Sequence, residues 1–536
     1  MENFTLRSLL EYRRALPAVL AALTVAIYIS VVMRFSPSKN PLFASLPFAG
    51  ILAHAAGTSS IDLNWHPPAV SFINDLATVI NGTGVNGFVF NSSVLPAGVP
   101  YGTYNWCNMP HVRPQEYLQV DESYVLEYVE VIHRHHKRTP YAANTFPKES
   151  YPWNCDDEGL FFYGKPLPKG SQPVDTYWSV YTSASNPFAP EGFNGTCRFP
   201  QITRGGLDDS FQHGKDLFDV YHDMLHFLPS TYNPEVVSFR VTNNIITSQV
   251  ASMVIAGMFP EHAGQDVPLL IQPASIDSLE PAYTCTAASE LTNAYGPGSN
   301  STAWLAHLDA SAPLHASLDS ISGVDPSASA WHTTWDHYFD NLSARLCHAK
   351  PLPCTSDGNT TTTTTTADPS LCITLAQAEQ VFRLGEYEYS FLYRDAPASL
   401  RTSVGGYGVW IAELAQNLRH AIDPAAPSST GDAGGRGVRY RHNVAHDGSV
   451  ARLLSILQVD EMVWPGMGSE VVFELFSREK RFYVRALWGG RVLRSSNPSL
   501  GSVDLLPAET LLAYFDGLVG RGARKVPELC RASERL

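Results

Sequence analysis

A short buried strand constrains the fold of this chain more than any other feature. Residues 124–132, YVLEYVEVI, carry apolar side chains on both faces when extended. Two apolar faces are typical of a central strand in a sheet that helices cover. The strand leads directly into the densest positive cluster of the sequence, HRHHKR at 133–138. Because ligands bind at the carboxyl ends of strands in open α/β sheets, this junction predicts a binding site.

The rest of the chain alternates strand and helix patterns. Strands are predicted near 124–133, 236–242, 438–444 and 470–487. Helices are predicted at 374–393, 409–422, 450–457 and 507–519. Interleaved patterns of this kind predict an α/β fold with a central mixed sheet flanked by helices. We expect one domain over 71–536, with a mainly helical cap inserted at about 150–235 and 262–390.

The N-terminus predicts how the chain enters its compartment. Three arginines precede an uncharged apolar run at 15–33, which Arg34 closes. As a helix this run is roughly 28 Å long, close to the thickness of the bilayer core. The length favours an uncleaved signal anchor over 1–35, which would make the chain a type II membrane protein with its bulk in the lumen. The alternatives are a cleaved signal peptide and a buried helix of a soluble protein. Residues 36–70, rich in Pro, Ala, Ser and Gly, are expected to form a stalk.

Cysteines and glycosylation sequons agree with the secretory pathway. The eight cysteines all follow the apolar run, and none forms a C-x-x-C pair, so we expect disulfides rather than a metal site. A short-loop bridge among Cys347, Cys354 and Cys372 is plausible, but the spacing leaves the connectivity open. Asparagines in sequons stand at Asn81, Asn91, Asn194, Asn300, Asn341 and Asn359. Together they predict a glycoprotein.

The positive cluster has the chemistry of a phosphate site. Arg134, His135 and Arg138 form an R-H-x-x-R-x-P pattern that ends at Pro140. Two guanidiniums at this spacing can converge on one tetrahedral anion, and a neutral imidazole between them could attack phosphorus. The formal net charge of −14 and the absence of a basic tail exclude a general nucleic-acid binder. The expected partner is therefore a small phosphorylated substrate.

The pattern resembles the R-H-G-x-R-x-P signature of the histidine acid phosphatases, the two-domain branch of the histidine phosphatase superfamily. Four later stretches resemble that family in the same order, between about 124 and 515: QITRGGLDDSFQHGKDLFDVY, VVSFRVTNNIITSQVASMVIAGMFP, YRHNVAHDGSVARLLSIL and WPGMGSEVVFEL. Five ordered matches are more specific than any one of them. The resemblance implies a phosphoglycerate mutase-like fold.

The resemblance also implies a role for each matching residue. His135 would be the nucleophile and would carry the phosphoryl group. Phosphoryl oxygens would be held by Arg134, Arg138, Arg240 and His446. Asp447 would protonate the leaving alcohol and then help to activate water, which favours acidic pH. An arginine cage stabilises charge by itself, so no metal and no cofactor are expected.

Two departures from the family pattern keep a second hypothesis open. His136 stands where the family has glycine, and Ile246-Thr247 stands where it has a second arginine after R-S-T. The chain is therefore predicted to be an active acid phosphatase or, alternatively, a catalytically degenerate membrane-anchored phosphate-binding protein. The family leaves the substrate open among general phosphomonoesters, inositol phosphates and phosphorylated sugars.

Other histidines have simpler interpretations. His133 and His135 would share a strand face, but no acidic or cysteine partner lies at ligand spacing, so we expect no metal there. His213 is expected to be a surface residue of a helix, and His442 a strand residue.

Overall fold

The computed structural model describes residues 60–531, except 90–94, 96, 149–151, 156–159, 163–175, 179, 182–184, 187–194, 263–264, 356–370 and 426–436. The described chain from Ser60 onward forms one compact unit. The predicted anchor at 1–35 and most of the predicted stalk lie outside the described residues. Among the described residues, no helix is both long and apolar enough to cross a bilayer.

The centre of the fold is an eight-stranded mixed sheet, as predicted. Its strands run in the order β10-β8-β7-β1-β6-β4-β5, with β9 beside β8. Their bounds are β1 Val125–Arg134, β4 Val237–Val241, β5 Leu269–Leu270, β6 Tyr440–Ala445, β7 Glu470–Arg478, β8 Arg481–Trp488, β9 Arg491–Val492 and β10 Leu506–Pro507. Strands β1, β6, β4 and β5 are parallel, and β7 pairs antiparallel with β1. A separate pair, β2 Leu160–Phe162 and β3 Thr176–Trp178, lies off this sheet.

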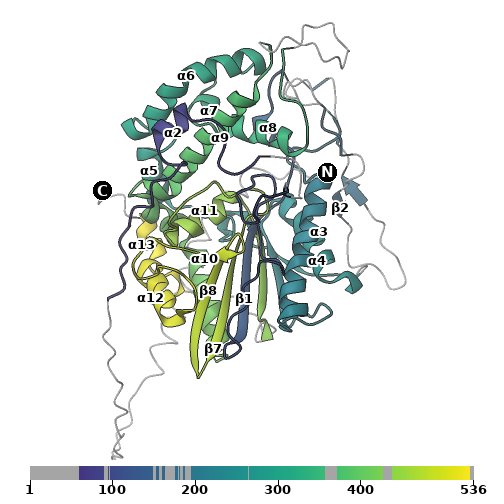
Figure 1. Ribbon diagram of the computed structural model, residues 1–536, viewed down its shortest axis with the longest axis vertical. Coiled ribbons are helices and arrows are strands. Elements are labelled where there is room, and N and C mark those ends of the chain that lie inside the picture. The colour runs from purple at the N-terminus through teal and green to yellow at the C-terminus, as the bar shows by residue number, and fades with distance from the viewer. Residues whose placement is uncertain are drawn as a thin grey trace, which may run out of the picture. The chain divides into compact units, whose positions relative to one another are not determined.

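One face of the sheet is covered by α3 (Arg204–Phe218) and α4 (Ile245–Met258), as Figure 1 shows. The two helices approach closely because each offers a glycine. A Cβ on Gly214 would lie 2.1 Å from the Val254 carbonyl oxygen, and one on Gly257 would lie 2.1 Å from that of Phe211. Although α3 falls in the range expected for the cap, its apolar side packs with β1 and β4 in one core, so the expected cap boundary is wrong there.

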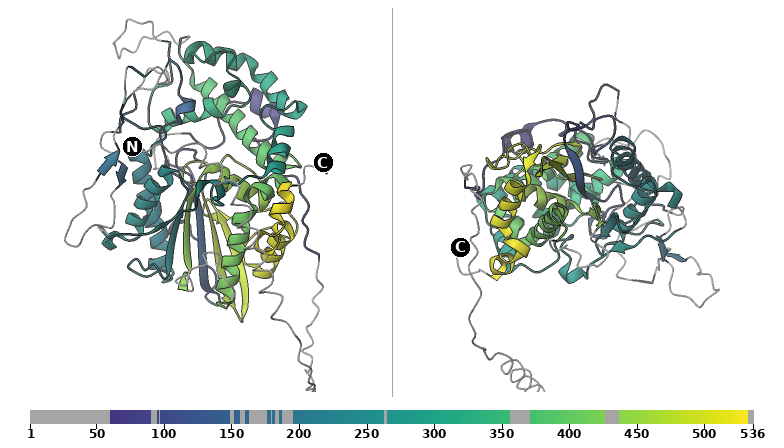
Figure 2. Two further views of the ribbon diagram at one scale, coloured as in Figure 1. Left: turned by 180° about the vertical axis from the view of Figure 1, so that it is seen from behind. Right: turned by 90° about the horizontal axis from the view of Figure 1, so that it is seen from below.

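The opposite face carries α10 (Ser399–Ile422), α11 (Asp447–Ile456) and α12 (Ala508–Val519), which confirms three predicted helices. Their apolar faces and the sheet form the largest buried cluster of the described chain. In the left view of Figure 2, which looks from behind, the yellow α12 lies beside the sheet. On this side α5 (Thr286–Tyr295) and α13 (Val526–Arg531) also pack on α10. Elsewhere the described chain has 3-10 turns at Ala142–Asn144, Pro260–His262, Ala274–Ile276 and Arg521–Ala523.

A mainly helical cap lies at one end of the sheet (Figure 1). Its helices are α2 Leu76–Asn81, α6 Thr302–Ser322, α7 Ser329–His332, α8 Asp336–Cys347 and α9 Leu375–Ser390. They share their own buried cluster. Helix α9 begins with a capping box in which the Thr374 and Gln377 side chains satisfy each other's backbone N–H groups. Two π-helical turns, Asp219–Met224 and Phe391–Asp395, follow α3 and α9.

Residues 60–70 belong to the compact unit and not to a loose stalk. Ile61 and Trp65 pack on the core formed by α10, α11 and α12. The backbone N–H of Asp62 donates to Ser499 Oγ at 2.8 Å, and that of His66 donates to Gln458 Oε1 at 2.7 Å. The expected stalk therefore ends earlier than predicted.

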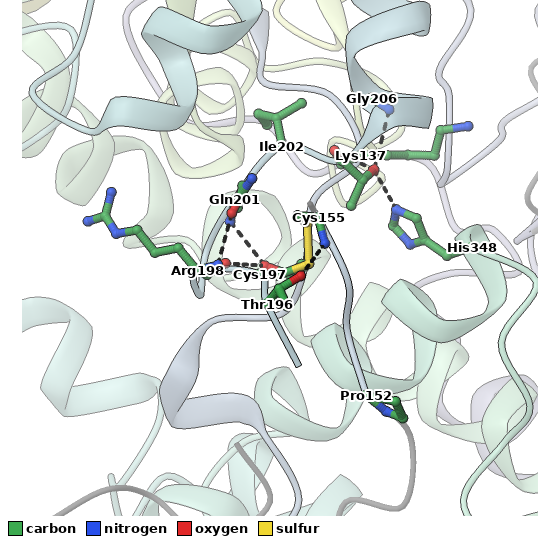
Figure 3. The surroundings of a disulfide bond; sticks show 12 residues. Lys137, Pro152, Cys155, Thr196, Cys197, Arg198, Gln201, Ile202, Gly206 and His348 are labelled. Atoms are coloured by element: carbon green, nitrogen blue, oxygen red, sulfur yellow. Dashed lines mark hydrogen bonds between the residues drawn. A yellow bond between two sulfur atoms is a disulfide. The ribbon is translucent and has the colours of Figure 1, made fainter. Parts of the chain in front are cut away.

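All eight cysteines form disulfides, as predicted. The pairs are Cys107–Cys347, Cys155–Cys197, Cys285–Cys530 and Cys354–Cys372. The last pair is the expected short-loop bridge. Figure 3 shows the Cys155–Cys197 bond beside residues 198–206, which lie against the segment after β1. There the backbone N–H of Thr139 donates to the Gln201 carbonyl at 3.0 Å. Four disulfides fit an oxidising compartment and therefore the secretory pathway.

The sequons differ in their access to solvent. Asn81 and Asn300 are exposed, whereas Asn341 is fully buried in α8. The Asn341 Nδ2 donates to the Asn144 carbonyl at 2.8 Å, and its Oδ1 accepts from Arg345 Nε at 2.9 Å. Because the amide nitrogen that would carry a glycan is already bonded inside the fold, the expectation of a glycan at Asn341 is wrong. Asn91, Asn194 and Asn359 lie outside the described residues.

Candidate active site

Three parallel strands end together at the edge of the sheet that faces the cap. In the register of these strands Arg134 pairs with Ala445, and Val241 pairs with Val444. The residues that follow each strand therefore meet at one place, as expected for parallel strands. The residues that follow β1 and β6 border a cavity of about 390 Å³. It is lined by Trp106, Arg134, His135, Arg138, Tyr141, Asn144, Glu280, Pro281, Ala282, Asp336, Asp340, Tyr389, His446, Asp447, Gly448, Ser449 and Trp464.

Arg134 is held from three sides. Its Nη1 donates to the Pro465 carbonyl at 2.7 Å, and its Nη2 lies 3.0 Å from Asp447 Oδ2. The guanidinium carbon lies 4.7 Å from the ring centroid of Trp106, a cation–π contact. The side chain is 1% exposed, so its orientation is fixed by the protein and not by solvent.

Arg138 is fixed by residues that sequence analysis missed. Its Nη1 donates to Asp340 Oδ1 at 2.9 Å, and its guanidinium carbon lies 4.3 Å from the ring centroid of Tyr141. Asp340 is itself fixed, because its Oδ2 accepts from Asn144 Nδ2 at 2.8 Å. Nε of Arg138 and Nε of Arg134 are buried without a hydrogen-bond partner in the described part of the chain. Unused guanidinium donors beside a cavity are suited to an anionic ligand.

Within the described residues, only one ring nitrogen of His135 makes a hydrogen bond. Its Nδ1 lies 3.0 Å from the His136 carbonyl oxygen, and a carbonyl only accepts, so the proton is on Nδ1 and Nε2 carries a lone pair. Burial, followed by the charges of Arg134 and Arg138, holds the pKa of His135 well below its usual range. The imidazole is therefore neutral, the form in which it is a nucleophile.

His446 and Asp447 lie at the N-terminus of α11. His446 Nε2 is 2.9 Å from Thr242 Oγ1, and its ring centroid lies 5.4 Å from that of His135. Burial is the main cause that lowers the pKa of His446 to about 4. Asp447 Oδ2 accepts from Trp464 Nε1 at 3.0 Å as well as facing Arg134. Burial alone would raise the pKa of Asp447, but Arg134 and these hydrogen bonds outweigh it, and the pKa lies below its usual value.

Arg240 is the one predicted phosphate ligand that the structure does not bring to the cavity. Its Nη1 donates to Glu413 Oε2 at 2.8 Å, and its Nη2 donates to Gln272 Oε1 at 2.7 Å and lies 3.2 Å from Asp277 Oδ1. It precedes the edge of the sheet, where Thr242 lies instead. Its predicted role remains a prediction that these contacts do not favour.

His136 is accommodated in place of the family glycine. Its ring is fully buried and does not line the cavity. The backbone there does not adopt a positive φ, so the position does not require glycine. The space comes from Gly468, where a Cβ would lie 2.3 Å from His136 Cε1. Glycine at 468, with a φ of +72°, thus offsets the larger residue at 136.

Acidic residues from the cap also line the cavity. Asp336 and Asp340 come from α8, and Glu280 comes from the loop before α5. Burial, followed by repulsion from Asp340 and Asp447, raises the pKa of Asp336 to about 7. The Asp336 side chain is 46% exposed, so it also meets the solvent of the cavity. Isolated acids in a cap carry no local motif, so sequence analysis had no signal for them.

Two expectations about other histidines have opposite outcomes. His442 is a strand residue of β6, as predicted. His213 is fully buried in α3 and is not a surface residue, because the face of α3 that carries it packs toward the sheet.

The edge of the parallel strands brings together a neutral histidine, two fixed arginines and a histidine–aspartate pair. These groups define the class of site: one suited to phosphoryl transfer. The model of the histidine phosphatase superfamily (branch 2) matches residues 125–488, and the chain belongs to this family. Membership supports phosphatase activity.

The chain is also similar to several named proteins. The chain is 23% identical over 390 residues to counting factor 60 of Dictyostelium discoideum, covering 70% of this chain and 82% of that one. It is 25% identical over 388 residues to human lysophosphatidic acid phosphatase type 6, covering 69% and 79%. Among solved structures, Hafnia alvei phytase in complex with tartrate matches with a TM-score of 0.48 at 13% identity, covering 75% and 99%.

Proposed function

We propose that the protein hydrolyses phosphomonoesters through a phosphohistidine on His135. The observation that carries this proposal is the neutral imidazole of His135, which lies beside Arg134 and Arg138 and has a lone pair on Nε2. A nucleophile of this kind needs a phosphoryl group placed in line and its oxygens stabilised. Two fixed guanidiniums and His446 supply that stabilisation.

In the first step, His135 Nε2 attacks phosphorus, the P–O ester bond breaks, and the leaving oxygen takes a proton from Asp447. In the second step, water attacks the phosphohistidine, Asp447 takes the proton from that water, and inorganic phosphate leaves with Nε2 restored. Asp447 is ionised in the free site because Arg134 faces it. A bound phosphoryl group competes for Arg134 and raises the pKa of Asp447, which prepares it to donate.

The charge in the site supports metal-independent chemistry. The guanidiniums of Arg134 and Arg138 already present positive charge to the cavity, which is the role that a divalent cation has in other phosphoryl-transfer sites. The proposal assigns no metal ion to this cavity.

The cavity lining favours substrates with one phosphate. Four carboxyl side chains, Glu280, Asp336, Asp340 and Asp447, line it beside two arginines. Such a lining binds one phosphoryl group at the arginines and repels further phosphates. Aromatic side chains on the wall, among them Tyr389 and Trp464, offer apolar contact to the remainder of the substrate. One relative is named a lysophosphatidic acid phosphatase, and that ester also carries a single phosphate.

We further propose that the phosphatase is a type II protein of the secretory pathway. The four disulfides support the compartment. The apolar run at 15–33 supports the anchor.

The decisive experiment is hydrolysis of 4-nitrophenyl phosphate by the full chain made in a glycosylating eukaryotic host. The assay runs from pH 4 to 8, with and without EDTA added at the start of a short measurement. His135→Ala is compared with His222→Ala, a partly exposed histidine on the far part of α3's π-helical extension. We expect EDTA-insensitive turnover that His135→Ala abolishes and His222→Ala leaves intact. An acid-labile phosphoryl label on the wild type, absent from His135→Ala, identifies the intermediate.

Two observations favour the alternative, a degenerate phosphate-binding protein. Arg240 lies outside the cavity, and Ile246 stands where the family has an arginine. A folded wild type that binds vanadate or phosphate without turnover would establish this alternative and reject the enzyme. Comparing glucose 6-phosphate with inositol hexakisphosphate tests the substrate class. A preference for the polyphosphate would reject the single-phosphate proposal.

A further inference from the structure

Behind the cavity, three histidines from separate elements converge in the interior. His133 lies in β1, His136 follows it, and His213 lies in α3. All three are fully buried. One ring nitrogen from each lies within 4.8 Å of the other two. Figure 1 shows α3 beside the sheet that contains β1.

Two of these rings have their protons fixed on the side away from the cluster. His133 Nδ1 lies 2.8 Å from the Arg134 carbonyl, which only accepts, so Nδ1 carries the proton and Nε2 a lone pair. His213 Nε2 lies 2.8 Å from Glu470 Oε2, a fully buried carboxylate, so His213 Nδ1 carries a lone pair. His133 Nε2 is buried with no hydrogen-bond partner in the described chain.

His136 cannot satisfy both lone pairs. Its Nε2 lies 3.1 Å from His213 Nδ1, so a proton on Nε2 serves that contact and leaves His133 Nε2 unpaired. His136 Nδ1 is also buried without a partner in the part that the structure describes. The cluster therefore holds more inward lone pairs than protons, a costly arrangement for fully buried groups.

A metal ion would give these unpaired ring nitrogens a common partner. Two imidazole ligands at 2.0–2.1 Å from a tetrahedral Zn²⁺ stand about 3.3 Å apart, close to the spacing of the His136 and His213 nitrogens. The outer contacts match those of metal-binding histidines, which donate their second N–H to a carboxylate or backbone carbonyl.

We propose that His133, His136 and His213 bind a transition-metal ion of the class that prefers imidazole, with Zn²⁺ as the first candidate. The ion joins α3 to the segment that carries His135. The carbonyl of His136 accepts from His135 Nδ1, so a ligand bond on the His136 ring stiffens the support of the neighbouring imidazole. The ion lies outside the substrate cavity, and the proposal does not depend on the proposed reaction.

A second cavity offers a route to the cluster. It has a volume of about 730 Å³, and its lining includes His111, Asp209 and Asp216. His111 Nε2 lies 2.8 Å from Asp216 Oδ2, and the His111 ring stacks on that of His213 with centroids 4.2 Å apart. His111 therefore lies between this cavity and the cluster.

The test measures metal content of the full chain after dialysis against metal-free buffer. His213→Gln removes a ligand. His442→Gln is the matched control, because His442 is also fully buried and its ring centroid lies 4.9 Å from that of His133. We expect about one Zn²⁺ per chain in the wild type and His442→Gln, and less than a tenth of that in His213→Gln.

A second measurement uses the wild type alone, in case His213→Gln does not fold. Prolonged incubation with a strong chelator should lower the melting temperature by a few degrees, and added Zn²⁺ should restore it. Co²⁺ in place of Zn²⁺ should give visible absorption bands that report imidazole ligands on the ion. The proposal is overturned if the wild type holds no metal and Zn²⁺ or Co²⁺ changes neither stability nor spectrum, or if His213→Gln retains the ion. The short EDTA assay of activity tests the substrate cavity and not the histidine cluster. EDTA would quickly remove an ion from the open cavity, whereas an ion enclosed by the three histidines exchanges slowly.

Discussion

Arg134 Nη2 lies 3.0 Å from Asp447 Oδ2, which joins the end of β1 to the first turn of α11. The pair is asymmetric, because Arg134 is 1% exposed and Asp447 is 24% exposed. The arginine is a fixed part of the wall, while the carboxylate also faces the cavity. In the proposed reaction, a phosphoryl group that displaces Asp447 from Arg134 would raise the proton affinity of Asp447.

Asp447→Asn should lower kcat in a way that depends on the leaving group. Without a proton donor, alkyl phosphates should lose about 10³-fold or more, whereas 4-nitrophenyl phosphate, whose leaving group needs little protonation, should lose about 10²-fold or less. Kinetics of both substrates check this, with Asp208→Asn, an exposed carboxylate on α3, as the control. Equal losses for the two substrates would show that Asp447 is not the acid.

The pH dependence should contain a contribution from Asp336. Its raised pKa of about 7 means that the carboxyl is neutral in acid and ionises as the pH rises through that value. The added negative charge repels the phosphoryl group, so kcat/KM should fall on the alkaline side. Asp336→Asn keeps the side chain neutral and should make the fall from pH 6 to 8 shallower. An unchanged slope relative to wild type would contradict the assignment.

Gly468→Ala should destabilise the fold through a clash with His136. Placing Ala at positive φ costs about 1–2 kcal/mol, and overpacking against a buried ring adds about 1–3 kcal/mol. Gly501→Ala is the matched control, because its φ is +52° and nothing lies within 4 Å of the new Cβ. Urea unfolding should show the larger loss for Gly468→Ala.

The same clash predicts a coupling. His136→Gly should recover part of the loss in Gly468→Ala, with a coupling energy of about 1–3 kcal/mol, and none of the loss in Gly501→Ala. Additive losses in both double variants would mean that Gly468 is not what makes room for His136.

Removing either of two disulfides of similar span should lower stability, but only one removal should also affect substrate binding. Cys107–Cys347 and Cys285–Cys530 close loops of 240 and 245 residues, so removing either pair should cost about 2–5 kcal/mol. Trp106, next to Cys107, packs on the Arg134 guanidinium. Replacing Cys107 and Cys347 by Ser should therefore raise KM several-fold as well, whereas replacing the other pair should lower the melting temperature alone. A KM effect of equal size in both variants would argue against this support.

The edge of the sheet was predictable because its signals are local. The apolar run at 124–132 predicted β1, and the two motifs at 134–138 and 446–447 follow strands whose parallel pairing brings them together. Arg240 shows the limit of this reasoning. The motif placed it correctly on β4, but the contacts of its side chain with Glu413 and Asp277 depend on how α10 and a loop pack against that strand.

By itself, the sequence determined the α/β class, the strands that end at the site, the presence of disulfides and the five residues that meet at the cavity. Each of these depends on periodicity or on short motifs, which are properties of neighbouring residues. The tertiary structure alone decided that Asp336 and Asp340 face those five residues and that His213 lies against His133 and His136. These contacts join side chains far apart in the chain, and their burial and proton affinities exist only once packing has excluded water.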